Sequence, residues 1–235
     1  MTAALFSEIT GIGTVIDRAY TQKHSRTVNG FFKNVMYLFA KMFEMLSWTF
    51  LAEFIQKPLI TGSLIPSSSY LAEKMIHGAD LQAADVVLEC GPGTGAFTGY
   101  ILQRMKPHAK FAAIEINPQF AAAFKAAHPG VSLFEDSVEN LCDICEAMGV
   151  EGVDCVISGL PWAFFPKSMQ ISILDQLMLV LNPGGRFVTF EYLQSVALPA
   201  QRSFAALLPI YFSSVSKSSI VWLNFPPAFV FRCRR

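Results

Sequence analysis

The feature that most constrains the fold is a short apolar run that ends in three closely spaced glycines. The stretch Asp85–Thr98 reads DVVLECGPGTGAFT, and three β-favouring residues precede Glu89 in it. The glycines are Gly91, Gly93 and Gly95. Such a pattern predicts a buried parallel strand, a tight turn and the start of a helix. The G-x-G-x-G spacing is shorter than the dinucleotide-binding fingerprint G-x-G-x-x-G, so the loop predicts a ligand site without naming the ligand.

Strands and helices are predicted to alternate along the rest of the chain. Apolar runs rich in β-branched and aromatic residues predict strands, and the segments between them carry helical periodicity. This alternation indicates a doubly wound α/β fold with ligands at the carboxyl ends of the strands. The further predicted strands are 111–117, 131–136, 153–162, 186–192, 215–223 and 228–234, the last two antiparallel. The predicted helices include 97–105, 120–127, 168–181 and one around the C-x-x-C at 142–145, and a turn is expected at 182–185.

Composition limits the classes of partner and site. The 235 residues carry 18 basic and 18 acidic side chains, and a protein that binds nucleic acid would normally show a basic excess, so no nucleic-acid partner is expected. Hydrophobic residues make up 52% of the chain, yet no charge-free apolar run is long enough for a membrane span and no secretion signal is evident. Five cysteines and four scattered histidines predict neither a disulfide framework nor a metal site.

The N-terminal segment, residues 1–60, is predicted to be a separate helical extension. Every charge from Arg18 to Lys41 is positive, and Phe31–Trp48 placed on a helix has a broad apolar face of Phe, Met and Leu beside a narrow polar one. This pattern favours a helix that lies in a membrane interface. A helix packed on the domain core, or a dimer face, is the alternative. Ser67 and Ser68 are the candidate N-caps of the next helix.

Acidic and polar residues follow the predicted strands at the end where ligands bind. Glu89, Glu115, Asp136 and Ser158 all stand at predicted carboxyl ends, in chain order. Glu115 lies 20 residues after Gly95, the place where an acidic residue can accept both hydroxyls of a ribose. Each residue alone could merely end a strand, but together they predict one nucleoside-binding site.

The motifs E-C-G-P-G-T-G and A-I-E-I-N resemble those of class I S-adenosylmethionine-dependent methyltransferases. The resemblance implies a Rossmann-like domain over 61–235, with a seven-stranded, mostly parallel sheet whose last strand is antiparallel, and S-adenosylmethionine as cofactor. It implies that Glu115 holds the ribose, that Asp136 faces the adenine amino group, and that the glycine loop passes beneath the methionine part. The full set of implied cofactor-binding residues is Ser67, Glu89, Gly91, Pro92, Gly93, Thr94, Gly95, Glu115, Ile116, Asp136, Ser137 and Ser158.

The turn after the fourth predicted strand of the parallel series indicates the methyl acceptor. Gly159-Leu160-Pro161-Trp162 is similar to the Asn-Leu-Pro-Tyr of rRNA adenine dimethylases, but glycine replaces the asparagine. Ser158–Pro161, together with 62–68, instead resembles bacterial phospholipid N-methyltransferases, which convert phosphatidylethanolamine stepwise to phosphatidylcholine. That family implies a lipid amine acceptor, anionic lipids as partners, and a cytoplasmic enzyme peripheral to the inner face of the cytoplasmic membrane. An rRNA adenine dimethylase and a non-catalytic cofactor-binding module are the alternatives.

Methyl transfer to an amine requires a neutral nitrogen in line with the sulfonium methyl, so alignment, exclusion of water and removal of a proton are expected to dominate. Glu191, Tyr192 or bulk water could take the proton. Trp162 could present a cation–π face to a methylated ammonium, or could be a core or rim aromatic. The candidate catalytic residues are Ser158, Gly159, Leu160, Pro161, Trp162 and Tyr192.

Overall fold

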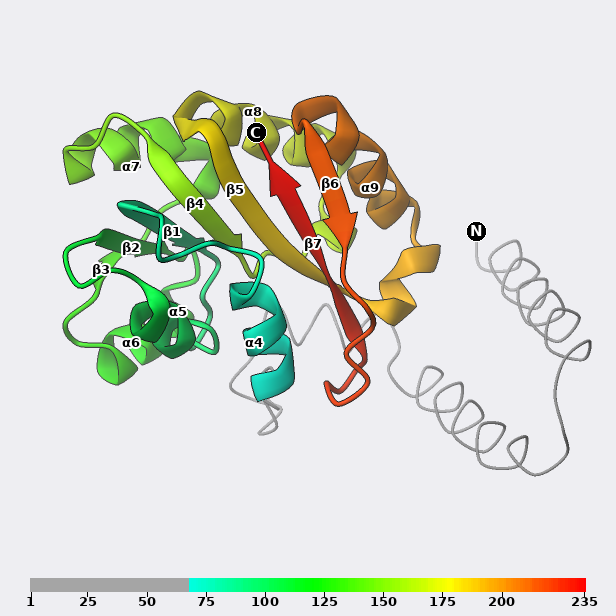
Figure 1. Ribbon diagram of the computed structural model, residues 1–235, viewed down its shortest axis with the longest axis horizontal. Coiled ribbons are helices and arrows are strands. Elements are labelled where there is room, and N and C mark those ends of the chain that lie inside the picture. The colour runs from blue at the N-terminus through cyan, green and yellow to red at the C-terminus, as the bar shows by residue number, and fades with distance from the viewer. Residues whose placement is uncertain (1–67) are drawn as a thin grey trace, which may run out of the picture. The chain divides into compact units, whose positions relative to one another are not determined.

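The computed structural model describes residues 68–235, which form an α/β domain (Figure 1). The predictions for Phe31–Trp48, for the 1–60 extension, for its boundary and for Ser67 lie outside these residues. The helices are α4 (Ser69–Ile76), α5 (Thr98–Arg104), α6 (Pro118–Ala127), α7 (Leu141–Met148), α8 (Lys167–Val180) and α9 (Pro199–Tyr211), with 3-10 turns η1 (Val138–Asn140), η2 (Trp162–Phe164) and η3 (Leu193–Ala197). The strands are β1 (Val86–Cys90), β2 (Lys110–Ile114), β3 (Ser132–Phe134), β4 (Val153–Ser158), β5 (Leu181–Tyr192), β6 (Ser214–Lys217) and β7 (Ala228–Arg234).

Within residues 68–235 the sheet has seven strands in the order β3-β2-β1-β4-β5-β7-β6. β1 to β5 pair in parallel, and β7 runs antiparallel to both β5 and β6. The predicted mostly parallel sheet with an antiparallel last strand is confirmed. The order reverses between β1 and β4, so a crevice for ligands is expected where these two strands end. We call the side of the sheet where β1 to β5 end its carboxyl edge.

Two apolar layers cover the two faces of the sheet. Residues of α7, α8 and α9 pack with one face, and residues of α4 and α5 pack with the other. Figure 1 shows α6 on the same side as α5. The central strands β1 and β4 are buried almost throughout, which explains their continuous apolar runs. The loops at the carboxyl edge are thereby mounted on a rigid, doubly covered sheet.

Helix α4 begins as predicted, because the Ser68 side chain accepts a hydrogen bond from Leu71 N. In the same way, Asn117 caps α6 and Pro118 occupies its first turn. Helix α9 was not predicted. Pro209 lies inside it and reads as a helix breaker, but it falls in the last turn, so only the end of the hydrogen-bond ladder is affected.

Two predicted elements differ in extent. The turn expected at 182–185 lies inside the assigned span of β5, where the pairing with β4 skips from Leu181 to Arg186. Gly184, with φ of +77°, provides the reversal there. Strand β6 ends at Lys217 rather than at 223, and beyond it only an isolated bridge joins Val221 to Ala228. Residues 218–227 therefore form a long loop at the carboxyl edge.

Candidate active site

The glycine loop forms the floor of the site at the end of β1. Gly91, Gly93 and Gly95 all have positive φ, between 58° and 91°, which residues with a Cβ rarely adopt. A Cβ on Gly93 would meet no atom within 4 Å, so the backbone here faces open space that a ligand can approach. Pro92 is buried beneath the loop and Thr94 is exposed at its tip.

Glu115 joins the loop to the end of β2. Its Oε2 accepts a hydrogen bond from Gly93 N at 3.1 Å, and its Oε1 accepts one from Asn117 N at 2.9 Å. Burial raises the pKa of this carboxyl group even though backbone hydrogen bonds from Asn117, Gly93 and Ile116 lower it. In the part of the chain that the structure describes, Glu115 has no ion-pair partner, so its remaining lone pairs are available to hydroxyl donors.

Two further predicted residues complete this half of the site. Ile116 follows Glu115 directly and is 69% exposed, an apolar surface that a flat ring could cover. Asp136, just beyond β3, accepts hydrogen bonds from Ser137 N and from Asn140 Nδ2 at 2.8 Å. Ser137 itself caps η1, where its Oγ accepts from Glu139 N. Ser137 therefore holds the turn, and both hydrogen bonds to Asp136 go to its Oδ1.

Glu89 differs from the other predicted carboxylates because it is fully buried. Its Oε2 accepts a hydrogen bond from Thr98 Oγ1 at 2.7 Å, which ties β1 to the first residue of α5. Its Oε1 has no partner within residues 68–235. Burial raises the pKa of Glu89 to about 8, only partly offset by Thr98. In this structure Glu89 braces the loop from below.

The turn after β4 packs directly against the glycine loop. Gly159 N donates to Cys90 O at 2.8 Å. A Cβ on Gly159 would lie 2.5 Å from Gly91 O, and a Cβ on Gly91 would lie 2.8 Å from a methyl of Leu160. No side chain fits at position 159 unless the backbone shifts. At this position, where adenine dimethylases carry an asparagine, the turn therefore has backbone groups and no side-chain amide.

Ser158 fixes this turn rather than facing the crevice. It is fully buried, and its Oγ accepts hydrogen bonds from Trp162 Nε1 at 3.1 Å and from Leu160 N at 3.3 Å. Its carbonyl oxygen accepts from Thr189 Oγ1 on β5. Pro161 follows as the N-cap of η2.

Trp162 requires a correction. The prediction that its ring could cover a methylated ammonium is wrong, because the residue is 1% exposed. Its ring stacks on Phe204 at 4.4 Å between centroids and meets Phe165 and Phe187 edge-on. The alternative of a core aromatic is the correct one. Its role is to hold Ser158, and hence the turn, through the indole N–H.

Gln170 was not singled out in the sequence, although it fixes the same turn from α8. It is fully buried, and its Nε2 donates to Trp162 O at 2.9 Å, to Phe165 O at 3.3 Å and to Ala200 O at 2.9 Å. A glutamine within a helix has no sequence signal for this contact, because its acceptors come from two other segments.

Glu191 and Tyr192 lie at the end of β5, beside the turn. Glu191 is 4% exposed; its Oε2 accepts a hydrogen bond from Ser195 Oγ at 3.0 Å, and its Oε1 has no partner within residues 68–235. Burial raises the pKa of Glu191 to about 7, although the Ser195 hydrogen bond lowers it. Burial and the neighbouring Glu191 charge also raise the pKa of Tyr192 above its usual value. Of the two, Glu191 is the group that can accept a proton near neutral pH.

Comparison with known proteins identifies the family. A family model described as a methyltransferase domain matches residues 87–185. The chain is 30% identical over 188 residues to an ornithine lipid N-methyltransferase from Singulisphaera acidiphila, a match that covers 79% of this chain and 94% of that protein. The chain belongs to the class I S-adenosylmethionine-dependent methyltransferases. Its cofactor is S-adenosylmethionine.

Other similar proteins share part of this methyltransferase or only its fold. A ribosomal RNA small subunit methyltransferase A from Chlorobaculum parvum is 35% identical over 138 residues, which cover 58% of this chain and 48% of that protein. A crystal structure of an O-methyltransferase from Bacillus cereus in complex with SAH has a TM-score of 0.58 at 13% identity and covers 79% of this chain and 90% of that one. At such low identity the second likeness confirms the fold alone.

The residues at the carboxyl edge fit the cofactor of the family. Glu115 would hold the ribose hydroxyls, Ile116 would cover the adenine ring, and Asp136 would accept from the adenine amino group. The open backbone at Gly93 would let the methionine part approach closely. No cluster of metal-ligating side chains occurs among residues 68–235, and Cys142 and Cys145 of the C-x-x-C lie on α7 as free thiols.

Proposed function

We propose that this methyltransferase adds methyl groups to the amine of a lipid headgroup at the surface of a membrane. The observation that carries the proposal is the turn at Gly159, which packs on Gly91 O and leaves no room for a side-chain amide that could recognise an adenine. The near full-length likeness to an ornithine lipid N-methyltransferase supports the same acceptor class. Phosphatidylethanolamine, its mono- and dimethyl derivatives and an ornithine lipid are the candidate acceptors.

The residues of the site suit this chemistry. When bound, S-adenosylmethionine supplies the methyl group, and its transfer forms the N–C bond as the C–S bond breaks. The backbone carbonyls of Gly159 and Leu160 orient the amine hydrogens, so the nitrogen lone pair is aligned by the turn that Ser158, Trp162 and Gln170 hold. Alignment of this kind can contribute a large part of the rate.

The acceptor must lose a proton, because a primary ammonium has a pKa near ~10.4, as in lysine. Glu191 takes this proton: it is buried at the end of β5, one of its oxygens is unpartnered within residues 68–235, and its pKa is about 7. Ser195 orients the other oxygen. Bulk water then receives the proton from Glu191 after transfer.

The chain would act as a peripheral protein on the inner face of the cytoplasmic membrane, with anionic lipids as partners. The basic charges from Arg18 to Lys41 and the amphipathic pattern of Phe31–Trp48 support this location. Among residues 68–235, no helix is long and apolar enough to cross a bilayer.

Expression in cells that make phosphatidylethanolamine tests the proposal. Mass spectrometry of their extracted lipids should detect N-methylated headgroups with the wild-type chain and far fewer with Glu115→Gln, whose side chain would bind the ribose hydroxyls more weakly. If no lipid gains a methyl group while ribosomal RNA does, the proposed acceptor class is wrong. The acceptor is then RNA, in agreement with the partial likeness to rRNA methyltransferases.

A further inference from the structure

The loop between β6 and β7 exposes large apolar side chains close together. Trp222 is 62% exposed, Leu223 67% and Phe225 51%. The other exposed large apolar residues among 68–235 lie scattered over several elements: Tyr70, Leu102, Ile116, Leu179, Val196 and Ile210. Single exposed apolar residues are normal on a protein surface, whereas a cluster at one tip indicates an interaction site.

A buried residue and hydrogen bonds anchor the loop to the domain, so its exposed apolar side chains are held in place. Val221 is buried and bridges to Ala228, and Ser218 Oγ accepts a hydrogen bond from Val230 N at 3.0 Å. Asn224 is 3% exposed; its Oδ1 accepts from Ser68 N and its Nδ2 donates to Pro226 O. The polar residue of the tip thus faces the protein, and its apolar neighbours Trp222 and Leu223 face outward.

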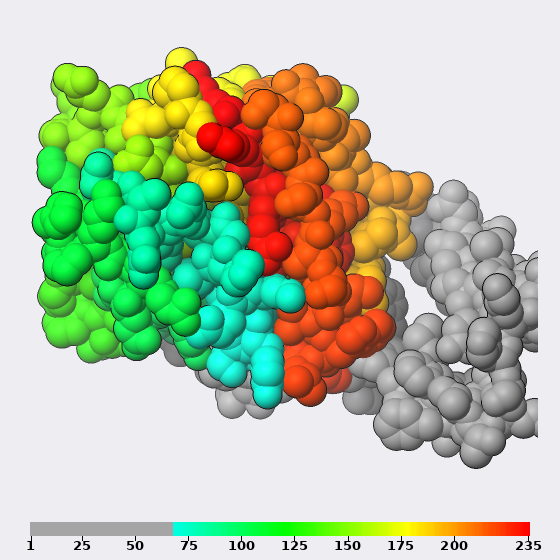
Figure 2. All heavy atoms as spheres, viewed as in Figure 1, coloured from blue at the N-terminus to red at the C-terminus, as the bar shows by residue number. Residues whose placement is uncertain are grey.

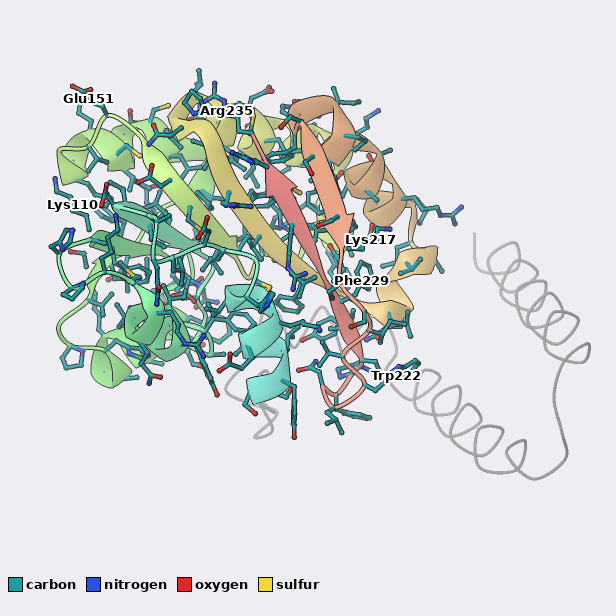
Figure 3. All side chains as sticks on the ribbon, viewed as in Figure 1. Lys110, Glu151, Lys217, Trp222, Phe229 and Arg235 are labelled. Carbon is teal, nitrogen blue, oxygen red and sulfur yellow. The ribbon has the colours of Figure 1, made fainter. Side chains whose placement is uncertain are left out.

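The loop lies at the carboxyl edge, where the active site is. Tyr192 at the end of β5 pairs with Ala228 at the start of β7, so the loop emerges beside Glu191 and Tyr192. Figure 3 shows Trp222 at the opposite end of the sheet from Glu151 and Arg235. In Figure 2 the loop, coloured orange-red, lies next to α4, whose first turn carries the exposed Tyr70.

We propose that the tip of the β6–β7 loop, residues 222–225, inserts into the interfacial layer of a phospholipid bilayer and turns the acceptor site toward it. The segment 218–227 holds no charged residue, so insertion requires no desolvation of a charge. Lys217 stands at its base, 4.9 Å from the ring centre of Phe231, where it can meet lipid phosphates. Tryptophan is favoured at this depth of a membrane because its ring is apolar and its N–H is polar.

A second copy of the chain is a poorer occupant for this surface. A stable protein interface buries about 800 Å² on each partner, more than a few partly exposed side chains offer. The insertion deepens the proposed function and rests on it only for the identity of the acceptor.

Vesicle flotation of the full chain with phosphatidylethanolamine and phosphatidylglycerol tests the insertion. The double variant Trp222→Ser with Leu223→Ser should bind about tenfold or more weakly, since each side chain loses apolar burial. The matched control is Leu179→Ser with Ile210→Ser: these residues are 69% and 75% exposed, near the ends of α8 and α9 at the opposite edge, and should leave binding unchanged. Equal binding by the double variant and the wild type, or equal loss in the control, would overturn the proposal.

Fluorescence provides a test that does not depend on a drastic variant. The chain has three tryptophans, and Trp162 is buried, so the difference between wild type and Trp222→Phe isolates the loop. Vesicles with brominated acyl chains should quench that difference signal strongly. No quenching would overturn the insertion.

Measurements of methylation activity distinguish a failure of the insertion proposal from a failure of the proposed function. On vesicles the double variant should methylate lipid amines about tenfold more slowly than wild type, and on detergent-dispersed lipid it should match wild type. If wild type methylates no lipid in either form, the proposed function fails while quenching still decides the insertion. If the double variant instead converts a dimer to a monomer in sedimentation, the occupant is a second copy and the bilayer proposal is overturned.

Discussion

The two halves of the carboxyl edge are built in different ways. The cofactor half, at β1 to β3, consists of backbone with positive φ and carboxylates that follow short strands, so its parts are near one another in sequence. The acceptor half, at β4 to β7, relies on side chains that fix a turn: Trp162 donates to Ser158 and Ser195 to Glu191 within four residues, whereas Thr189 of β5 donates to Ser158 O and Gln170 of α8 to Ala200 O across about thirty. The first half fits the cofactor, and in the proposed function the second half selects the methyl acceptor.

If this division is correct, substitutions in the acceptor half change turnover and leave cofactor affinity intact. Glu191→Gln should lower kcat about 100- to 1,000-fold, because it removes the proton acceptor. Turnover of the wild type should rise as pH passes about 7, where Glu191 loses its proton, and the variant should lack this step. Initial rates across pH 5.5–9, about the range that brackets this pKa, check it.

Two variants control the experiment on Glu191. Glu151→Gln changes an exposed carboxylate at the opposite edge and should match wild type. Ser195→Ala removes the hydrogen bond that lowers the pKa of Glu191, so the midpoint of the profile should move to higher pH. A Glu191→Gln profile that keeps the step near pH 7 would assign the proton to another group.

Gly159→Ala tests the turn itself. The added Cβ would lie 2.5 Å from Gly91 O, so the turn must move, and a displacement of about 1 Å at a reacting centre can lower turnover about 100-fold. Gly130→Ala, where a Cβ meets nothing within 4 Å, is the matched control. Normal kcat in Gly159→Ala would contradict the account of the acceptor half.

Glu115→Gln tests the cofactor half. The amide cannot accept from two hydroxyls and two backbone N–H groups as the carboxylate does, so affinity for S-adenosylmethionine should fall about 10- to 100-fold. Calorimetric titration measures it. Glu135→Gln, an exposed carboxylate just before Asp136, should bind the cofactor as wild type does. Unchanged affinity in Glu115→Gln would remove this residue from the site.

Glu89→Gln tests the cofactor half through the pH dependence of the free energy of unfolding. The folded state favours the protonated Glu89 because its pKa is raised from 4.5 to about 8, so this stabilisation is full below pH 4.5 and is lost as pH rises toward 8. The loss approaches about 4 kcal/mol by the upper end of that window, at about 1.36 kcal/mol per pKa unit. Urea unfolding at pH 5 and at pH 8.5, about the two sides of the window, should show a smaller difference for the variant. An identical difference would mean that Glu89 is not buried as described.

Sequence reasoning reached the cofactor half more fully because its signals are local. The run into Gly91, Gly93 and Gly95 and the spacing to Glu115 predict backbone conformation and position within one βαβ unit. The sequence leaves Trp162 open between a cation–π face and a core aromatic, because Phe204, which stacks on its ring, comes from helix α9, an element that the sequence pattern does not predict. Gln170 and the exposed tip of residues 222–225 escaped notice for the same reason: their roles depend on segments that are distant in the chain.

The most direct test of the central claim is a competition in one reaction. The full chain receives deuterated S-adenosylmethionine together with vesicles of phosphatidylethanolamine, vesicles of an ornithine lipid and ribosomal RNA, and mass spectrometry then locates the label. The account predicts label on a lipid amine and none on adenine. Label on RNA adenine, with unlabelled lipids, would contradict it.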